Sequence, residues 1–122
     1  MPRPQWRDAA GRSWPLPRPG ERLVFARHAH AALRAHIYAR DGYRCCECGA
    51  EAQEVPAPYD GRKTLFIAAT TQKGNRIPLV LDHRISLRNG GRTQPRNLQT
   101  LCATCNNTKA TRIDRVAGRV TP

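Results

Sequence analysis

The spacing of apolar residues along the chain predicts two helices and three strands. In residues 28–40, Leu33 and Ile37 stand four apart among alanines, as on a helix with one packed side. From residue 103 onward, apolar residues recur at helical spacing and stop near Gly118. The three intervening apolar runs predict strands at 63–71, 76–83 and 97–101.

The segments around these elements predict an arm and two loops. Residues 1–20 hold five prolines and four arginines, which disfavours helix and central strand, so we expect an extended, loosely held arm. Trp6 and Trp14 either anchor this arm on the domain or stack on bases, and anchoring is the commoner role. Residues 51–60 and 84–96 read as loops, and a turn at 73–75 lets the first two strands pair as a hairpin.

The charge of the chain points to a polyanionic partner. Lys and Arg number 21 against 9 Asp and Glu, which gives a net charge of +12 over 122 residues. Such a surplus favours nucleic acid or an anionic membrane surface, although a generic solvated surface is the alternative. Because no apolar run approaches ~20 residues and no signal-like segment opens the chain, we expect an intracellular (cytoplasmic) protein with reduced thiols and no membrane span.

Four of the five cysteines form two C-x-x-C pairs, Cys45/Cys48 and Cys102/Cys105. Two such pairs supply the four thiolates of a tetrahedral structural Zn²⁺ site, which would also stabilise a small core. The pairs have 53 residues between them, so the strands in that segment must bring them together. Cys46 should point away. Disulfides and buried free thiols are the alternatives for the pairs, and His28, His30 and His36 are minor candidates for ligands.

A second set of residues has the chemistry of a catalytic metal site. Asp82 and His83 end an apolar run, and Asn106 directly follows a cysteine of the second pair. Carboxylate and amide oxygens are hard ligands suited to Mg²⁺ or Mn²⁺, and a neutral imidazole beside the ion can act as a general base on water. An Asp-His pair is weak evidence on its own, because a lone histidine is more often structural.

Together these residues resemble the HNH endonucleases, whose fold is the zinc-supported ββα-metal (His-Me) finger. The resemblance covers positions 43–109. It is carried by 43–49, 81–85, Gly90-Gly91, 97–102, Cys105-Asn106 and Lys109. The first family position falls on His83 and the second on Asn97, fourteen residues later. Asn106 takes the third position, where the family name has His, which makes the chain an HNN variant.

The resemblance implies an α+β fold with a ββα-metal core and a four-cysteine zinc site, to which the residue pattern adds an N-terminal helix and the Pro-rich arm. We therefore expect the arm at 1–22 and an HNH endonuclease domain at 23–122. His83 would activate water, and Asp82 and Asn106 would hold Mg²⁺ or Mn²⁺, or else Ni²⁺ or another transition ion. Asn97 would tie the loop and keep His83 aimed. The implied reaction is metal-dependent hydrolysis of double-stranded DNA.

Basic residues surround the expected site and would neutralise phosphates, with a solvated charged face as the alternative for any one of them. They are Arg84, Arg88, Arg92, Arg96, Lys109, Arg112 and Arg115. No base-reading module is recognisable, so specificity should be low or supplied by a protein partner. The competing interpretations are a non-catalytic zinc module that binds nucleic acid and, more weakly, a zinc-stabilised protein-interaction domain. A phage or bacterial origin is expected from family analogy alone.

Overall fold

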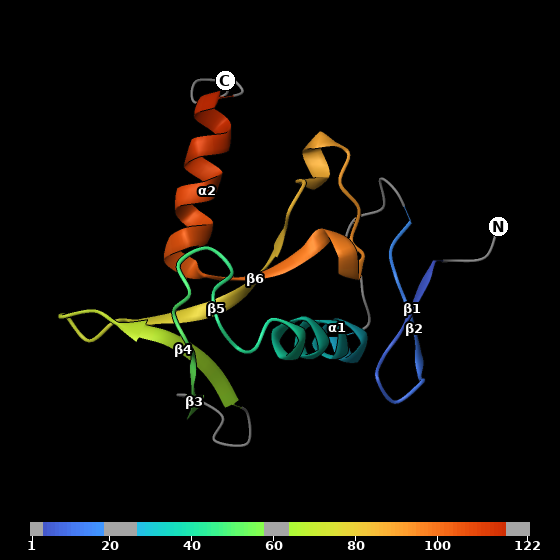
Figure 1. Ribbon diagram of the computed structural model, residues 1–122, viewed down its shortest axis with the longest axis horizontal. Coiled ribbons are helices and arrows are strands. Elements are labelled where there is room, and N and C mark those ends of the chain that lie inside the picture. The colour runs from blue at the N-terminus through green and yellow to red at the C-terminus, as the bar shows by residue number, and fades with distance from the viewer. Residues whose placement is uncertain (1–3, 19–26, 58–63, 117–122) are drawn as a thin grey trace. The chain divides into compact units, whose positions relative to one another are not determined.

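The computed structural model of the protein describes residues 4–18, 27–57 and 64–116, with the backbone alone for 27–30, 64 and 111–116. Its elements are β1 (Gln5–Arg7), β2 (Ser13–Pro15), α1 (Arg27–Arg40), β3 (Gln53–Pro56), β4 (Thr64–Thr70), β5 (Arg76–His83), β6 (Leu98–Cys102) and α2 (Ala103–Val116) (Figure 1). The α+β class, the N-terminal helix and the strand–loop–strand–helix order of β5, β6 and α2 are confirmed. The end of α2 expected near Gly118 lies outside the described residues.

The chain divides into two compact units. The first consists of Met1–Asp41 and Leu81–Gln99, and the second of Gly42–Val80 and Thr100–Pro122. The predicted boundary between residues 22 and 23 lies outside the described residues and stays a prediction. Among the described residues, neither helix is long and apolar enough to cross a membrane.

The core of the first unit joins the N-terminal segment to α1. Leu33 and Ile37, the pair that predicted the helix, pack with Trp6, Leu16 and Leu98. The prediction of a loosely held arm is therefore wrong for residues 5–16. β1 and β2 pair as an antiparallel hairpin with Trp6 opposite Trp14, and Trp6 is only 6% exposed. Proline disfavours strand pairing, but both strands are short and form their own two-stranded sheet, so few backbone hydrogen bonds are lost. Burial of the Trp6 indole stabilises this hairpin.

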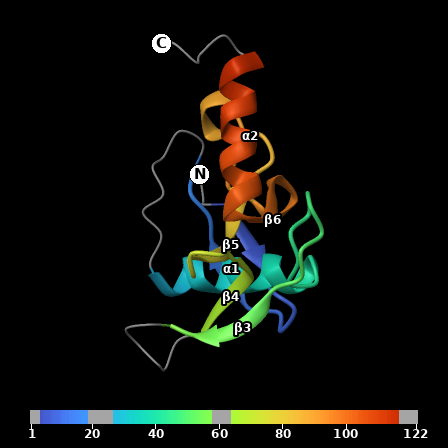
Figure 2. The same cartoon turned by 90° about the vertical axis from the view of Figure 1, so that its left-hand side faces the viewer.

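The second sheet has the strand order β3-β4-β5-β6. β4 and β5 pair antiparallel as predicted, and the register shifts between Ile67 and Ala69, where Ile67 faces Pro78. Proline has no N–H to give to the ladder, which explains an irregularity at this point. The loop predicted at 51–60 is wrong in part, because 53–56 form β3 alongside β4 (Figure 2). β3 is an edge strand, so Pro56 at its end costs the sheet little.

The core of the second unit is built around the cysteine pairs. Cys45, Leu101 and Cys102 are buried together, and Ala68, Ile77 and Val80 pack against them. α2 starts immediately after β6, so Cys102 ends the strand and Cys105 lies in the first turn of the helix (Figure 1). This junction fixes the second C-x-x-C pair relative to the sheet.

Candidate metal centre and active-site loop

The four paired cysteines converge in the second unit. The sulfur atoms of Cys45, Cys48, Cys102 and Cys105 all lie within 4.8 Å of one another, and Cys48 Sγ lies 4.0 Å from Cys102 Sγ. A tetrahedral ion with Zn–S bonds of about 2.3 Å would place its sulfur ligands about 3.8 Å apart. The donor set and its spacing therefore fit a zinc ion, and the four cysteines are positioned to bind a metal as predicted.

Each cysteine pair makes the same hydrogen bond from a backbone N–H to sulfur. The N–H of Cys48 donates to Cys45 Sγ, and the N–H of Cys105 donates to Cys102 Sγ, both at 3.4 Å. After the first pair, Gly49 has φ +77°, a conformation that glycine adopts without strain. Donation of N–H groups to sulfur favours the thiolate form that a metal requires.

The thiols differ in how readily they ionise. Burial alone would raise the pKa of Cys45, but the backbone N–H groups of Cys48, Cys102 and Glu47 outweigh burial and lower this pKa to about 7. Burial raises the pKa of Cys102. Burial and the neighbouring thiols raise the pKa of Cys105. A bound cation would supply the positive charge that allows all four groups to ionise together.

The remaining candidate ligands do not join this cluster. Cys46 is exposed and is not among the four clustered sulfurs, and its N–H donates to the carbonyl of Thr100 at 2.9 Å. The ring of His36 lies against Trp6 in the first unit, with ring centroids 4.8 Å apart, and His36 is not part of the metal-capable group found among the described residues. The side chains of His28 and His30 lie outside the described residues.

Asp82 and His83 have separate hydrogen-bond partners in the first unit. Gln99 Nε2 donates to Asp82 Oδ2 at 2.9 Å and so fixes one carboxylate oxygen. His83 Nε2 lies 2.8 Å from the hydroxyl oxygen of Thr93, which is only 6% exposed. A buried hydroxyl at this distance holds the orientation of the imidazole ring, and the tautomer of the ring sets which of the two groups donates.

Asn97 closes the loop between β5 and β6. It is 7% exposed, and its Oδ1 accepts from the N–H of Ile85 at 2.9 Å. Its Nδ2 donates to the carbonyls of Ile85 at 3.0 Å and of Arg92 at 2.8 Å. Its own carbonyl accepts from the N–H of Arg84 at 2.7 Å. The side chain thus joins Ile85 to Arg92, and the backbone carbonyl holds Arg84, which directly follows His83.

Two further residues fix this loop. A Cβ on Gly91 would overlap the Ile85 carbonyl and lie 2.9 Å from Asn97 Nδ2, so only glycine fits there. Arg40, the last residue of α1, donates to the carbonyls of Pro95 at 2.8 Å and Leu98 at 2.6 Å. The helix therefore holds both sides of Asn97 in place.

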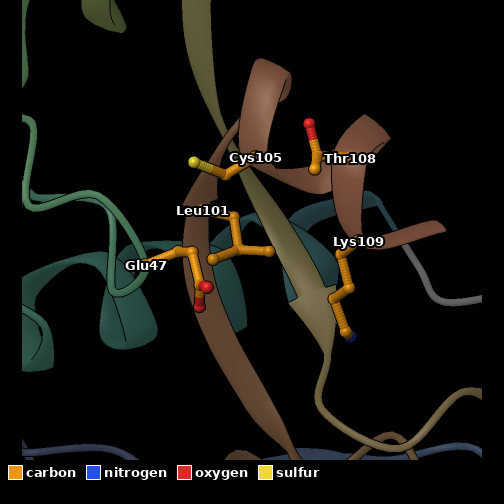
Figure 3. A pocket seen from close by; sticks show the side chains of 5 residues that line it. All are labelled: Glu47, Leu101, Cys105, Thr108 and Lys109. Atoms are coloured by element: carbon orange, nitrogen blue, oxygen red, sulfur yellow. The ribbon is translucent and has the colours of Figure 1, made fainter. Parts of the chain in front are cut away.

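The predicted DNA-binding residues differ in their exposure and in the unit to which they belong. The side chains of Arg84, Arg88, Arg92 and Arg96 are all exposed on the loop between β5 and β6. Lys109 is half-buried and, with Glu47 and Cys105, lines a hollow of about 80 Å³ in the second unit (Figure 3). The side chains of Arg112 and Arg115 lie outside the described residues.

Asn106 is half-buried in the first turn of α2, one residue after Cys105. It belongs to the second unit, whereas Asp82, His83 and Asn97 belong to the first. Its assignment as a second ligand of the catalytic ion rests on the sequence and stays a prediction.

Comparison with known families identifies the part of the chain that carries these residues. Residues 71–112 match the family model of the HNH endonucleases. The resemblance inferred from the sequence is thereby confirmed over this HNH segment, which includes Asp82, His83, Asn97 and the second cysteine pair. No curated protein and no solved structure matched the chain. HNH proteins are generally nucleases that act on nucleic acids, so the segment indicates a nuclease-type function.

Three residues of the HNH segment support its polar groups in ways that the sequence did not predict, although Gly91 and Gln99 lie among the positions that carry the resemblance. Thr93 contacts His83, Gln99 contacts Asp82, and Gly91 leaves room for the Ile85 backbone. Threonine and glutamine are common in loops and strands, and nothing in their spacing marks a partner. The adjacent Gly90-Gly91 pair was the available signal, since a glycine in a loop often marks a close backbone approach.

Proposed function

We propose that the protein is a metal-dependent DNA endonuclease that hydrolyses phosphodiester bonds with low sequence specificity. The observation that carries this proposal is the hydrogen bond between His83 Nε2 and the buried Thr93 hydroxyl, within a segment that matches the HNH endonucleases. Such a segment needs an imidazole that is oriented and neutral to act as a base on water.

In this proposal His83 is the general base. If Nε2 carries the ring proton and donates it to Thr93 Oγ1, then Nδ1 keeps the lone pair that accepts a proton from water. Hydrolysis then proceeds by attack of the resulting hydroxide on phosphorus, with the DNA 3′ oxygen as the leaving group. Asn97 acts indirectly, because its hydrogen bonds hold the loop that supplies Thr93.

Asp82 is the proposed first ligand of a divalent ion, Mg²⁺ or Mn²⁺ or a transition ion such as Ni²⁺. Gln99 fits this role for Asp82, since its side-chain amide holds one carboxylate oxygen at 2.9 Å. Asn106 is the proposed second ligand, and its amide oxygen is a hard donor of the right class. The ion would stabilise the charge that develops on the phosphate and on the leaving oxygen.

The four-cysteine cluster is proposed to hold a structural Zn²⁺ ion that takes no part in hydrolysis. All four positions of a tetrahedral ion would be filled by thiolates, which leaves none for water or substrate. Double-stranded DNA is the proposed substrate because the chain has a net charge of +12 and four exposed arginines on one loop. A protein partner would supply specificity where it is needed.

The test is cleavage of supercoiled plasmid by the zinc-loaded protein with Mg²⁺, Mn²⁺ or Ni²⁺ and with EDTA, beside His83→Ala. We expect metal-dependent cleavage that falls on the order of 10²-fold or more in His83→Ala while DNA binding is kept. His36→Ala is the control, because it removes an imidazole that packs on Trp6. A parent protein that binds plasmid but never cleaves it would instead be a non-catalytic zinc module. Cleavage by His83→Ala at the parental rate would remove His83 from the mechanism.

A further inference from the structure

Two large apolar side chains stand exposed in one turn of the loop between β5 and β6. Ile85 is 57% exposed and Leu87 is 47% exposed. Tyr43 is the other large hydrophobic residue in the described part of the chain that is exposed to a similar degree, at 38%. Single exposed apolar side chains are ordinary on protein surfaces. Here two of them lie within three residues of the chain.

The backbone beneath these side chains is fixed. Both the N–H and the carbonyl of Ile85 are hydrogen-bonded to the buried side chain of Asn97. The carbonyl of Ser86 accepts from the N–H of Asn89 at 3.0 Å and from the N–H of Gly91 at 2.9 Å. The carbonyl of Leu87 accepts from the N–H of Gly90 at 3.2 Å. The exposure of both side chains is therefore held by the fold and is not the result of a loose loop.

The charge around this turn complements a polyanion. Arg84 and Arg88 flank the two apolar residues in the sequence, and both are exposed. Residues 84–97 contain four arginines and no acidic residue. A partner for this turn must offer anionic groups on either side of an apolar surface about one side chain wide. Duplex DNA has this pattern, with phosphates flanking the faces of stacked bases.

We propose that Ile85 and Leu87 form an apolar wedge that enters duplex DNA and opens a base step, while Arg84 and Arg88 contact the flanking phosphates. The inference rests on the proposed function in that DNA is taken as the substrate. Aliphatic side chains inserted at base steps unstack them and kink the duplex. A membrane surface is the poorer match, because interfacial anchoring uses a longer amphipathic helix with a broad apolar face.

The test measures binding and unstacking separately from cleavage, in a His83→Ala background. Binding of a short duplex containing 2-aminopurine is followed by anisotropy and by 2-aminopurine fluorescence, which rises when a base unstacks. We expect Ile85→Ser and Leu87→Ser each to weaken binding about tenfold, since each loses the burial of one aliphatic side chain. The double variant should also abolish the rise in fluorescence.

Two matched variants separate the wedge from charge and from folding. Arg88→Gln should lower the slope of log affinity against log salt by about one while the fluorescence rise remains. The serine variants should leave that slope unchanged. Ile85→Thr keeps the β-branch and should weaken binding as Ile85→Ser does, whereas Ile85→Val should bind like the parent. Circular dichroism and thermal unfolding identify any variant that fails to fold.

The wedge is overturned if the folded double variant binds the duplex as tightly as the parent with the same fluorescence. It is equally overturned if DNA binding is unchanged while the double variant loses binding to phosphatidylglycerol vesicles or changes its oligomeric state. These results differ from failure of the proposed function. A protein that unstacks DNA but never cleaves it would support the wedge and contradict the proposed function. A double serine variant that retains His83 and cleaves at the parental rate would contradict the wedge alone.

Discussion

Asn97 hydrogen-bonds to the peptide groups on both sides of Ile85 through a single side chain. Its Oδ1 accepts from the Ile85 N–H at 2.9 Å, and its Nδ2 donates to the Ile85 carbonyl at 3.0 Å. The side chain thus reproduces the pairing that a neighbouring strand would give, at a point where the chain has left the sheet. This amide is one of the groups that hold the loop that follows His83.

Replacing Asn97 by Asp should destabilise the protein by about 3 kcal/mol. The change keeps the shape of the side chain but removes both N–H donations and buries a carboxylate against the carbonyls of Ile85 and Arg92. Urea unfolding of the zinc-loaded protein measures the loss. Asn89→Asp makes the same change at an exposed position of the loop and should cost less than about 0.5 kcal/mol. Equal stability of the two variants would contradict the role of Asn97.

Gly90 and Gly91 should respond differently to alanine. Gly90 has φ +88° with open space around it, so Gly90→Ala should cost about 1 kcal/mol through backbone conformation alone. Gly91→Ala places a methyl group on the Ile85 carbonyl, and the loop must move, which should cost about 2–3 kcal/mol. Urea unfolding gives both values, and the exchange rate of the Ile85 amide reports the movement. A smaller cost at Gly91 than at Gly90 would show that the backbone yields easily.

Elemental analysis should find one zinc ion per chain, lost in Cys102→Ser and kept in Cys46→Ser. Cys102 is a buried member of the four-sulfur cluster, whereas Cys46 lies between two ligands and is exposed. Loss of zinc should lower the thermal midpoint on the order of 10 °C, because the ion stabilises the small core of the second unit. Normal zinc content in Cys102→Ser, or its loss in Cys46→Ser, would require a different ligand set.

Thr93→Val should reduce cleavage roughly 10- to 100-fold, whereas Thr93→Ser should stay within a few-fold of the parent. Valine keeps the volume of this buried side chain but removes the hydroxyl that lies 2.8 Å from His83 Nε2. The ¹⁵N resonances of the His83 ring should show the Nε2–H tautomer in the parent and the serine variant and a mixture in the valine variant. Cleavage by Thr93→Val at the parental rate would show that the hydroxyl does not position the base.

Asp8 should stabilise the N-terminal hairpin at neutral pH and lose this effect in acid. Its carboxylate accepts from Trp14 Nε1 at 2.8 Å and from the backbone N–H groups of Arg12 and Ala10. The Trp14 hydrogen bond, followed by that from Arg12, lowers the pKa of Asp8 below its ordinary value of 3.8. Because the folded pKa is the lower one, the stabilisation is complete above the ordinary value and is lost as pH falls through the folded pKa.

The measurement for Asp8 is the NMR signal of the Trp14 indole N–H as pH is lowered. This local signal is preferred to global melting because acid also releases metal from thiolates. The parent should titrate with a midpoint below 3.8, and Asp8→Asn should lack the transition and have a less stable hairpin at pH 7. Glu54→Gln, the same change at another exposed carboxyl, should leave the hairpin unaffected. A midpoint at or above 3.8 would contradict the assignment.

The sequence alone determined the features that depend on local spacing. Leu33 and Ile37 predicted α1 because residues four apart share one helix face, and the observed helix runs from Arg27 to Arg40. The two C-x-x-C pairs predicted the metal cluster because three-residue spacing is enough to form each turn. The Asp-His and Asn positions carried the family resemblance that the match over 71–112 confirms. The catalytic roles of Asp82, His83, Asn97 and Asn106 stay predictions.

Tertiary structure decided the features that depend on partners distant in sequence. β3 forms because it pairs with β4 through backbone hydrogen bonds. The N-terminal hairpin is held in place because Trp6 packs against Leu33 and Ile37 of α1. The partners of His83 and Asp82, Thr93 and Gln99, lie ten and seventeen residues away, at positions that no periodicity marks. A hydrogen bond needs its two atoms within about 3 Å of each other, and only the folded path of the chain determines which residues meet that condition.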